Sequence, residues 1–214
     1  MSSINIRGNL EQKAYDQIKQ MIIDCELVPG DQVIQDQLAK KIGISRTPLR
    51  QAITQMERDL YLEITPQGIF VRDLNESFMK SVWEVRSVLE GLACRLAASK
   101  INSATIIYLR ALFEEAYEEA KKGNQEPYRE ADIIFHKKIL ELSENMFLKQ
   151  NIDHTKVLDI AFNQGLLRPP SETFGEHMEI IQSLENKDSN NAEQLMVEHL
   201  RKSINVLHSQ SKKA

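Results

Sequence analysis

Apolar positions recur every three or four residues through the first third of the chain, which is the spacing of helices that bury one face. The pattern predicts three helices, over about 10–25, over 36–41 and from Ser45 onward. It also predicts two short strands, over 61–64 and over 69–71. Gly43 is placed to end the second helix, and the Ser45 hydroxyl is placed to cap the third. The residues Thr65-Pro66-Gln67-Gly68 between the strands predict a tight hairpin. These elements in this order indicate a helix-turn-helix followed by a β-hairpin wing.

From residue 76 onward the pattern is helical throughout, and only four glycines and three prolines occur in 139 positions. Six helices are predicted in this region, over about 76–99, 103–122, 127–143, 147–165, 172–187 and 189–209. We therefore expect a mainly α protein with two domains. The first is a winged helix-turn-helix over residues 1–74, and the second is an antiparallel bundle of six or seven helices over residues 75–214.

Composition excludes several classes of protein. Hydrophobic residues make up 42% of the chain and charged residues 27%, which are ordinary values for a globular protein. No apolar run approaches the roughly 20 residues that cross a bilayer, so we expect no membrane partner. The N-terminus lacks the pattern of a secretory signal. The two cysteines, Cys25 and Cys94, do not form a disulfide framework, which favours a reduced, cytoplasmic setting.

The net charge of −4 hides a local basic stretch. Residues 40–58 hold five basic side chains against one acidic side chain. Four polar residues occupy the exposed start of the third helix, namely Ser45, Arg46, Thr47 and Arg50. The second helix of a helix-turn-helix reads the major groove from its N-terminal residues, and arginine can pair with guanine O6 and N7. The alternative is a solvated basic face, but here the charges coincide with the turn, the cap and the wing.

Four polar side chains are predicted on the inner faces of three helices in the second region. Asp132 and His136 lie four residues apart and project from one helix face, while His177 and His199 each have apolar residues one turn away. Three neutral imidazoles and a carboxylate suit a divalent metal ion and favour zinc or nickel over manganese or iron. The alternative is a set of hydrogen-bonded core histidines without a metal.

Residues 15–73 resemble the DNA-binding domain of the GntR family of bacterial transcription regulators. The strings that carry this resemblance are LAKKIGISRTPLRQAITQMERDLYL and, after it, TPQGIFV. It implies that Arg46, Arg50 and Thr47 of the third helix contact bases or phosphates. It also implies that the wing tip, at Gln67 and Gly68, contacts the minor groove. Many members carry a basic residue where this chain has Asp36, so the resemblance does not extend to a DNA contact at that position.

Residues 76–209 resemble the all-helical effector domain of the FadR branch of the same family, a domain of the FCD type. The resemblance rests on EVRSVLEGLACRLAA, on Asp132 and His136 as D-x-x-x-H, and on the pairs Glu176-His177 and Glu198-His199. It implies that Asp132, His136, His177 and His199 bind a metal ion. Together the two resemblances cover nearly the whole chain, in the order that the family shows.

Arg86 is predicted to point into the bundle, because it shares a helix face with apolar residues. A buried guanidinium needs a partner, and two remain open. One is Glu90, four residues further on, in a structural ion pair. The other, which the resemblance implies, is the carboxylate of a small organic acid bound at the metal. Asn163 and Asn145 are further candidates for effector binding, although either could instead cap or line a helix end.

These expectations describe a bacterial ligand-responsive transcriptional regulator, a repressor, that binds a palindromic operator in double-stranded DNA as a homodimer. A small carboxylate metabolite at the metal site would control it. Two other classes stay open. A metal-dependent, hydrolase-like enzyme could use a His/Asp centre to activate water, but no nucleophile or general-base motif accompanies the four ligands, so we expect no enzyme. A helical scaffold that does not bind DNA would use its wing to contact protein.

Overall fold

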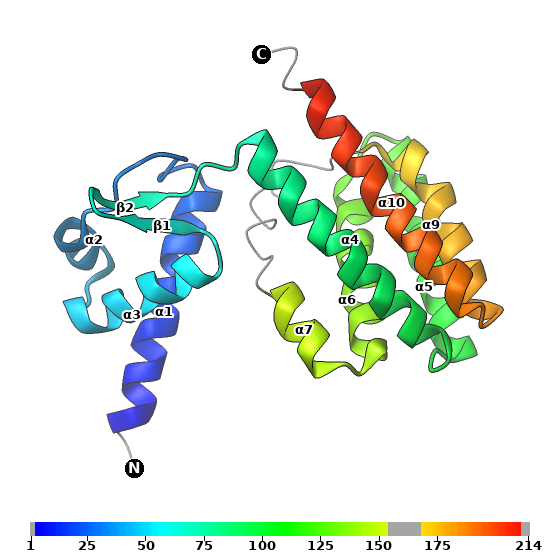
Figure 1. The fold of residues 1–214 in the computed structure, drawn as a ribbon, viewed down its shortest axis with the longest axis horizontal. Coiled ribbons are helices and arrows are strands. Elements are labelled where there is room, and N and C mark those ends of the chain that lie inside the picture. The colour runs from blue at the N-terminus through cyan, green and yellow to red at the C-terminus, as the bar shows by residue number, and fades with distance from the viewer. Residues whose placement is uncertain (1–2, 154–167, 211–214) are drawn as a thin grey trace. The chain divides into compact units, whose positions relative to one another are not determined.

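A computed structural model describes residues 3–153 and 168–210 of the chain. These residues fall into two compact units that divide between Leu74 and Asn75. The first unit contains α1 (Ser3–Ile23), α2 (Gln35–Ile42), α3 (Arg46–Arg58), β1 (Leu62–Thr65) and β2 (Gly68–Val71). The second contains α4 (Glu76–Ala98), α5 (Ser103–Lys121), α6 (Glu126–Ser143), α7 (Met146–Asp153), α9 (Pro170–Glu185) and α10 (Ser189–Gln210) (Figure 1). The predicted fold class, mainly α with a winged helix-turn-helix and a helical bundle, is confirmed.

The turn between α2 and α3 forms because Gly43 adopts a left-handed conformation with φ of 76°. Its backbone N–H donates to the Ala39 carbonyl and ends α2, as the sequence predicted. Five apolar side chains of α3 are buried, and α3 packs against α1 and α2; they are Pro48, Leu49, Ala52, Ile53 and Met56. Ser45 occupies the N-cap position of α3, but its hydroxyl makes no capping hydrogen bond, so the expectation of a hydroxyl cap is wrong.

The wing is an antiparallel pair of strands in which Leu62 lies opposite Val71 and Thr65 lies opposite Gly68. Gly68 has φ of 144°, and a Cβ atom there would lie 2.6 Å from Nε2 of Gln32. Gln32 also pairs with Phe70 through an isolated bridge, which ties the start of the α2 region to the wing. The hairpin predicted from Thr65-Pro66-Gln67-Gly68 is therefore confirmed, and the wing is joined to the helix-turn-helix.

The helical unit is organised around α4, which packs against α10 and α6, while α5 packs against α6 and α9. Its core contains the fully buried aromatic rings of Phe113, Tyr128 and Phe135, and the Phe113 ring contacts the other two. The helix predicted over 147–165 is described only as α7, and its remaining predicted residues lie outside the described part of the chain. No helix among the described residues is both long and apolar enough to cross a lipid bilayer.

Gly91 lies where α4 meets α10 and allows the two helices to approach closely. A Cβ atom at Gly91 would lie 2.5 Å from Cγ2 of Val197, whereas Gly175 in α9 has no atom within 4 Å of its Cβ position. We expect Gly91→Ala to lower the free energy of unfolding by about 1–3 kcal/mol through overpacking. Gly175→Ala should raise it by about 0.5–1 kcal/mol, because alanine loses less backbone entropy in a helix. Urea denaturation at fixed metal content measures both, and a Gly91→Ala chain of undiminished stability would contradict this packing.

Candidate metal centre and nucleic-acid interface

The four predicted metal ligands come together in the core of the helical unit. Asp132 and His136 project from α6, His177 from α9 and His199 from α10, and one ligand atom of each lies within 4.8 Å of the others. All three imidazoles are buried, His177 completely. The i, i+4 spacing on α6 places its two ligands on one helix face, as the sequence predicted. Packing of α9 and α10 against the bundle supplies the other two.

Each of the three imidazoles is held through its Nδ1 atom by a residue outside the ligand set. His136 Nδ1 is bonded to the Glu90 carboxylate. His177 Nδ1 lies 3.1 Å from the Tyr128 hydroxyl, and His199 Nδ1 lies 2.8 Å from Oε2 of Glu176. A partner at Nδ1 fixes the orientation of an imidazole and directs the Nε2 lone pair to a metal. We therefore expect all three histidines to coordinate through Nε2.

The ligand atoms fit a divalent cation. Nε2 of His177 is buried, lies 3.1 Å from Oδ1 of Asp132 and makes no hydrogen bond to any residue that the structure describes. Nε2 of His136 lies 3.8 Å from the same oxygen. A buried lone pair beside a carboxylate oxygen is costly unless a proton or a metal ion lies between them, and a metal ion can serve all four ligand atoms at once. Three nitrogen ligands and one oxygen ligand are the donor set of zinc and related metals.

Burial and neighbouring charges set the protonation of the cluster. Burial, with the adjacent His199, lowers the pKa of His177 to about 4, and burial also lowers the pKa of His199. Burial would raise the pKa of Asp132, but the three histidines hold it well below its usual range. Burial would lower the pKa of His136, but the charges of Glu90 and Asp132 raise it. A metal ion would displace the proton on Nε2 of a protonated His136, because imidazole coordinates in its neutral form.

Glu176 and Arg168 lie beside His199 but are not among the four predicted ligands. Arg168 donates from Nη1 and Nη2 to the two carboxylate oxygens of Glu176, at 2.7 and 2.8 Å, and Lys202 donates to Oε1 at 2.9 Å. Burial would raise the pKa of Glu176, but these donors and His199 hold it well below its usual range. Glu176 is thus a carboxylate that keeps His199 in one orientation. The roles of Arg168 and Glu176 beside His199, and of Tyr128 beside His177, were not predicted from the sequence.

Arg86 is buried and forms an ion pair with Glu90. Its guanidinium carbon lies 4.9 Å from the centre of the Trp83 ring. Burial would raise the pKa of Glu90, but Arg86 and His136 lower it to about 2. Glu90 therefore links Arg86 to His136, a predicted metal ligand. Of the two partners predicted for Arg86, Glu90 is the one with which it forms an ion pair in the structure.

Of the two asparagines predicted to contact an effector, the structure describes only Asn145. The side-chain oxygen of Asn145 accepts from the Leu148 backbone N–H at 3.0 Å and caps the start of α7. This is the capping role that the sequence analysis left open for it. Asn163 lies outside the described residues.

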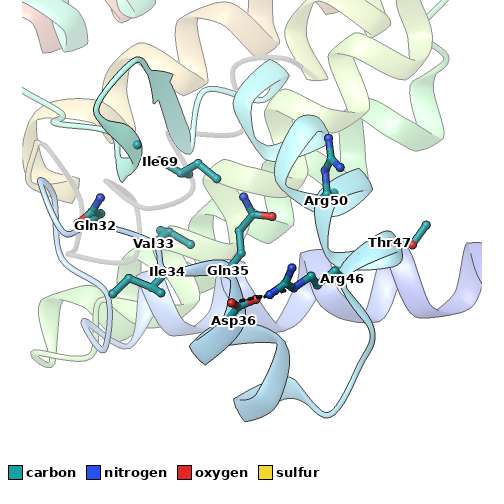
Figure 2. A pocket seen from close by; sticks show the side chains of 10 residues that line it. Gln32, Val33, Ile34, Gln35, Asp36, Arg46, Thr47, Arg50 and Ile69 are labelled. Carbon is teal, nitrogen blue, oxygen red and sulfur yellow. Dashed lines mark hydrogen bonds and ion pairs between the residues drawn. The ribbon is translucent and has the colours of Figure 1, made fainter.

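The first unit presents a basic hollow of about 570 Å³ between α2, α3 and the wing. Arg46, Thr47 and Arg50 line it, as does Asp36 (Figure 2). Gly68 of the wing lines it as well. The predicted DNA-contacting residues Ser45 and Gln67 are exposed but are not among its lining residues. Exposed arginines at the N-terminal end of a recognition helix can reach phosphates and base edges.

Each of the two units matches a known protein family. Residues 10–71 match the family described as bacterial regulatory proteins, gntR family, and residues 81–202 match the FCD domain. The transcriptional regulator YdhC of Bacillus subtilis is 26% identical over 86% of this chain and 85% of its own. The transcriptional repressor RspR of Escherichia coli is 21% identical over 94% of this chain and 90% of its own.

Among solved structures, Escherichia coli McbR/YncC has the same fold. It superposes with a TM-score of 0.70 and 21% identity over 94% of this chain and 98% of its own. The FCD match covers more than half of the chain, and the gntR match covers most of the rest. The members of this family are regulators of transcription and not enzymes. The chain belongs to the GntR family of bacterial transcriptional regulators, with an FCD domain as its helical half.

Proposed function

We propose that this regulator is a metal-dependent repressor that binds a palindromic operator as a homodimer and responds to a small organic acid. Residues 1–74 would bind DNA, and residues 75–214 would bind the effector and form the dimer, in the cytoplasm where the chromosome lies. The observation that carries the proposal is the buried cluster of Asp132, His136, His177 and His199. The role of repressor is supported by relatives that carry this word in their names, RspR and a probable D-xylose utilization operon repressor of Paenarthrobacter nicotinovorans.

The four clustered side chains would hold one ion, for which zinc or nickel suits the donor set better than manganese or iron. A bound ion supplies a buried positive charge to which an organic carboxylate can bind. Arg86 would contact the second oxygen of that carboxylate, since a charge-assisted hydrogen bond from a guanidinium to a carboxylate is strong. Because Arg86 is already joined to Glu90, and Glu90 to His136, an effector at this place would alter a connected set of charges.

The winged unit would bind DNA through the residues around its basic hollow. Arg46 and Arg50 would contact base edges in the major groove, Ser45 and Thr47 the adjacent phosphates, and the tip at Gln67 and Gly68 the minor groove. Two such units in a homodimer would contact two half-sites. An effector can change operator affinity only by binding more tightly to one arrangement of the two units than to another.

Fluorescence anisotropy with DNA from upstream of the chain's own gene tests this proposal. The protein is stripped with a chelator, reloaded with zinc or nickel, and titrated with and without a panel of small mono- and dicarboxylates. We expect salt-dependent binding, and at least one acid that changes the affinity of the loaded protein by about fivefold or more. The same acid should have no effect on the stripped protein. Equal effects on loaded and stripped protein would show that the metal cluster takes no part.

A further inference from the structure

Asp36 and Arg46 form an ion pair at the edge of the basic hollow. Asp36 lies in the first turn of α2, and Arg46 is the first residue of α3. Oδ1 of Asp36 lies 2.6 Å from Nε of Arg46, and Oδ2 accepts a hydrogen bond from Nη2 at 2.6 Å (Figure 2). Both side chains are exposed, Arg46 by 70% and Asp36 by 63%. The carboxylate therefore binds the side of the guanidinium on which Nε lies.

This geometry determines which part of Arg46 can meet a ligand. A guanidinium is planar and has five N–H donors, and this carboxylate engages the edge formed by Nε and Nη2. The end formed by Nη1 and Nη2 still carries parallel N–H groups. Two parallel N–H donors match the O6 and N7 acceptors that guanine presents in the major groove. Arg50 has no ion-pair partner within the described ranges, so its guanidinium is not oriented in this way.

We propose that Asp36 is a specificity-determining residue, which orients Arg46 so that it reads a guanine at one position of each half-site. The inference rests on the proposed DNA binding of α3. The carboxylate would have two effects of opposite sign. It would sharpen discrimination between bases at one position, because it restricts the orientation of the guanidinium. It would weaken binding to DNA of any sequence, because its charge repels the phosphates.

The test compares the wild type with Asp36→Ala, Asp36→Asn and a matched control. The control is Glu26→Ala, which removes the same charge and breaks another exposed ion pair of the same unit, between Glu26 and Lys41 at 2.6 Å. Neither residue of that pair lines the hollow. Each full-length protein selects duplexes from a randomised library. Anisotropy then measures affinity for the selected operator, for its single-base variants and for random DNA. Circular dichroism confirms that each variant is folded.

We expect the wild type to select a guanine at a position where Asp36→Ala accepts other bases. Discrimination at that position should fall by about three- to fivefold, the upper part of what an exposed ion pair contributes. Affinity of Asp36→Ala for random DNA should rise by about twofold. Asp36→Asn should lie between the two, since its amide keeps one oxygen acceptor. Glu26→Ala should keep the wild-type discrimination at every position.

The possible failures are distinguishable. If the wild type selects no sequence, the proposed DNA-binding function fails, and the role of Asp36 fails with it. If the wild type selects a motif and Asp36→Ala selects the same motif with equal discrimination, the role of Asp36 alone is overturned. A uniform gain in affinity for all sequences would also overturn it, because the carboxylate would then only repel DNA. Altered discrimination at a position that is not a guanine would have the same consequence.

Discussion

Replacing both His177 and His199 with alanine should abolish metal binding and, with it, the stabilisation that the metal provides. The wild type should retain about one ion per chain, and its melting temperature should rise by about 5 °C or more when metal is restored to stripped protein. The double variant should hold almost no metal and show no such rise. The reason is that the cation would lose two of its four ligands, leaving only Asp132 and His136 on α6. Elemental analysis and thermal denaturation with and without metal measure the two effects.

A matched control for this variant removes two other histidines, His154 and His208, which lie outside the predicted ligand set. The control should bind metal like the wild type, because all four clustered ligands remain. Equal metal content in the wild type and the His177/His199 variant would show that any bound metal lies elsewhere. Loss of metal from the control as well would show that the binding is not confined to the cluster.

Replacing Arg50 with alanine should weaken operator binding by about 1–3 kcal/mol, or about five- to 150-fold. Arg50 is exposed at the N-terminal end of α3, in the hollow between α2, α3 and the wing. If it contacts a base, the loss should be concentrated at one base pair. If it contacts a phosphate, the loss should be uniform across sequences, with a shallower salt dependence. Anisotropy titrations at several salt concentrations distinguish the two contacts.

Arg58→Ala is the control for Arg50→Ala, since Arg58 is exposed at the other end of the same helix and carries the same charge. It should change operator affinity by less than about twofold, because the C-terminal end of a recognition helix lies farther from the bases. Similar losses in both variants would mean that α3 contributes only general electrostatic attraction, and its assignment as the recognition helix would be wrong.

The parts that the sequence predicted well depend on local spacing. The turn at Gly43 and the wing at Gly68 follow from short-range backbone chemistry, and both are present. The pairing of Asp132 with His136 follows from the helical repeat. Their convergence with two histidines on other helices depends on tertiary packing, which the periodicity of single helices does not contain. There the family resemblance supplied what local spacing could not.

The parts that the sequence analysis missed are long-range or side-chain specific. Glu176 was noted only as the neighbour of His177, yet its carboxylate holds His199 on another helix. Tyr128 gave no signal, because a tyrosine on an apolar helix face is ordinarily a packing residue. Glu90 was considered only as a partner for Arg86, whereas it also bonds His136. A search for polar residues on the inner faces of α4 and α6 would have found the last two.

Native mass spectrometry of the protein mixed with its selected operator tests whether two metal-loaded chains bind one duplex, because it counts chains, metal ions and duplexes in one complex. We expect a complex of two chains and one duplex with one metal ion for each chain. The corresponding complex of the His177→Ala/His199→Ala variant should lack the ions. A wild-type complex without metal, a variant complex that still carries the ions, or a metal-loaded chain that binds no duplex would contradict this expectation.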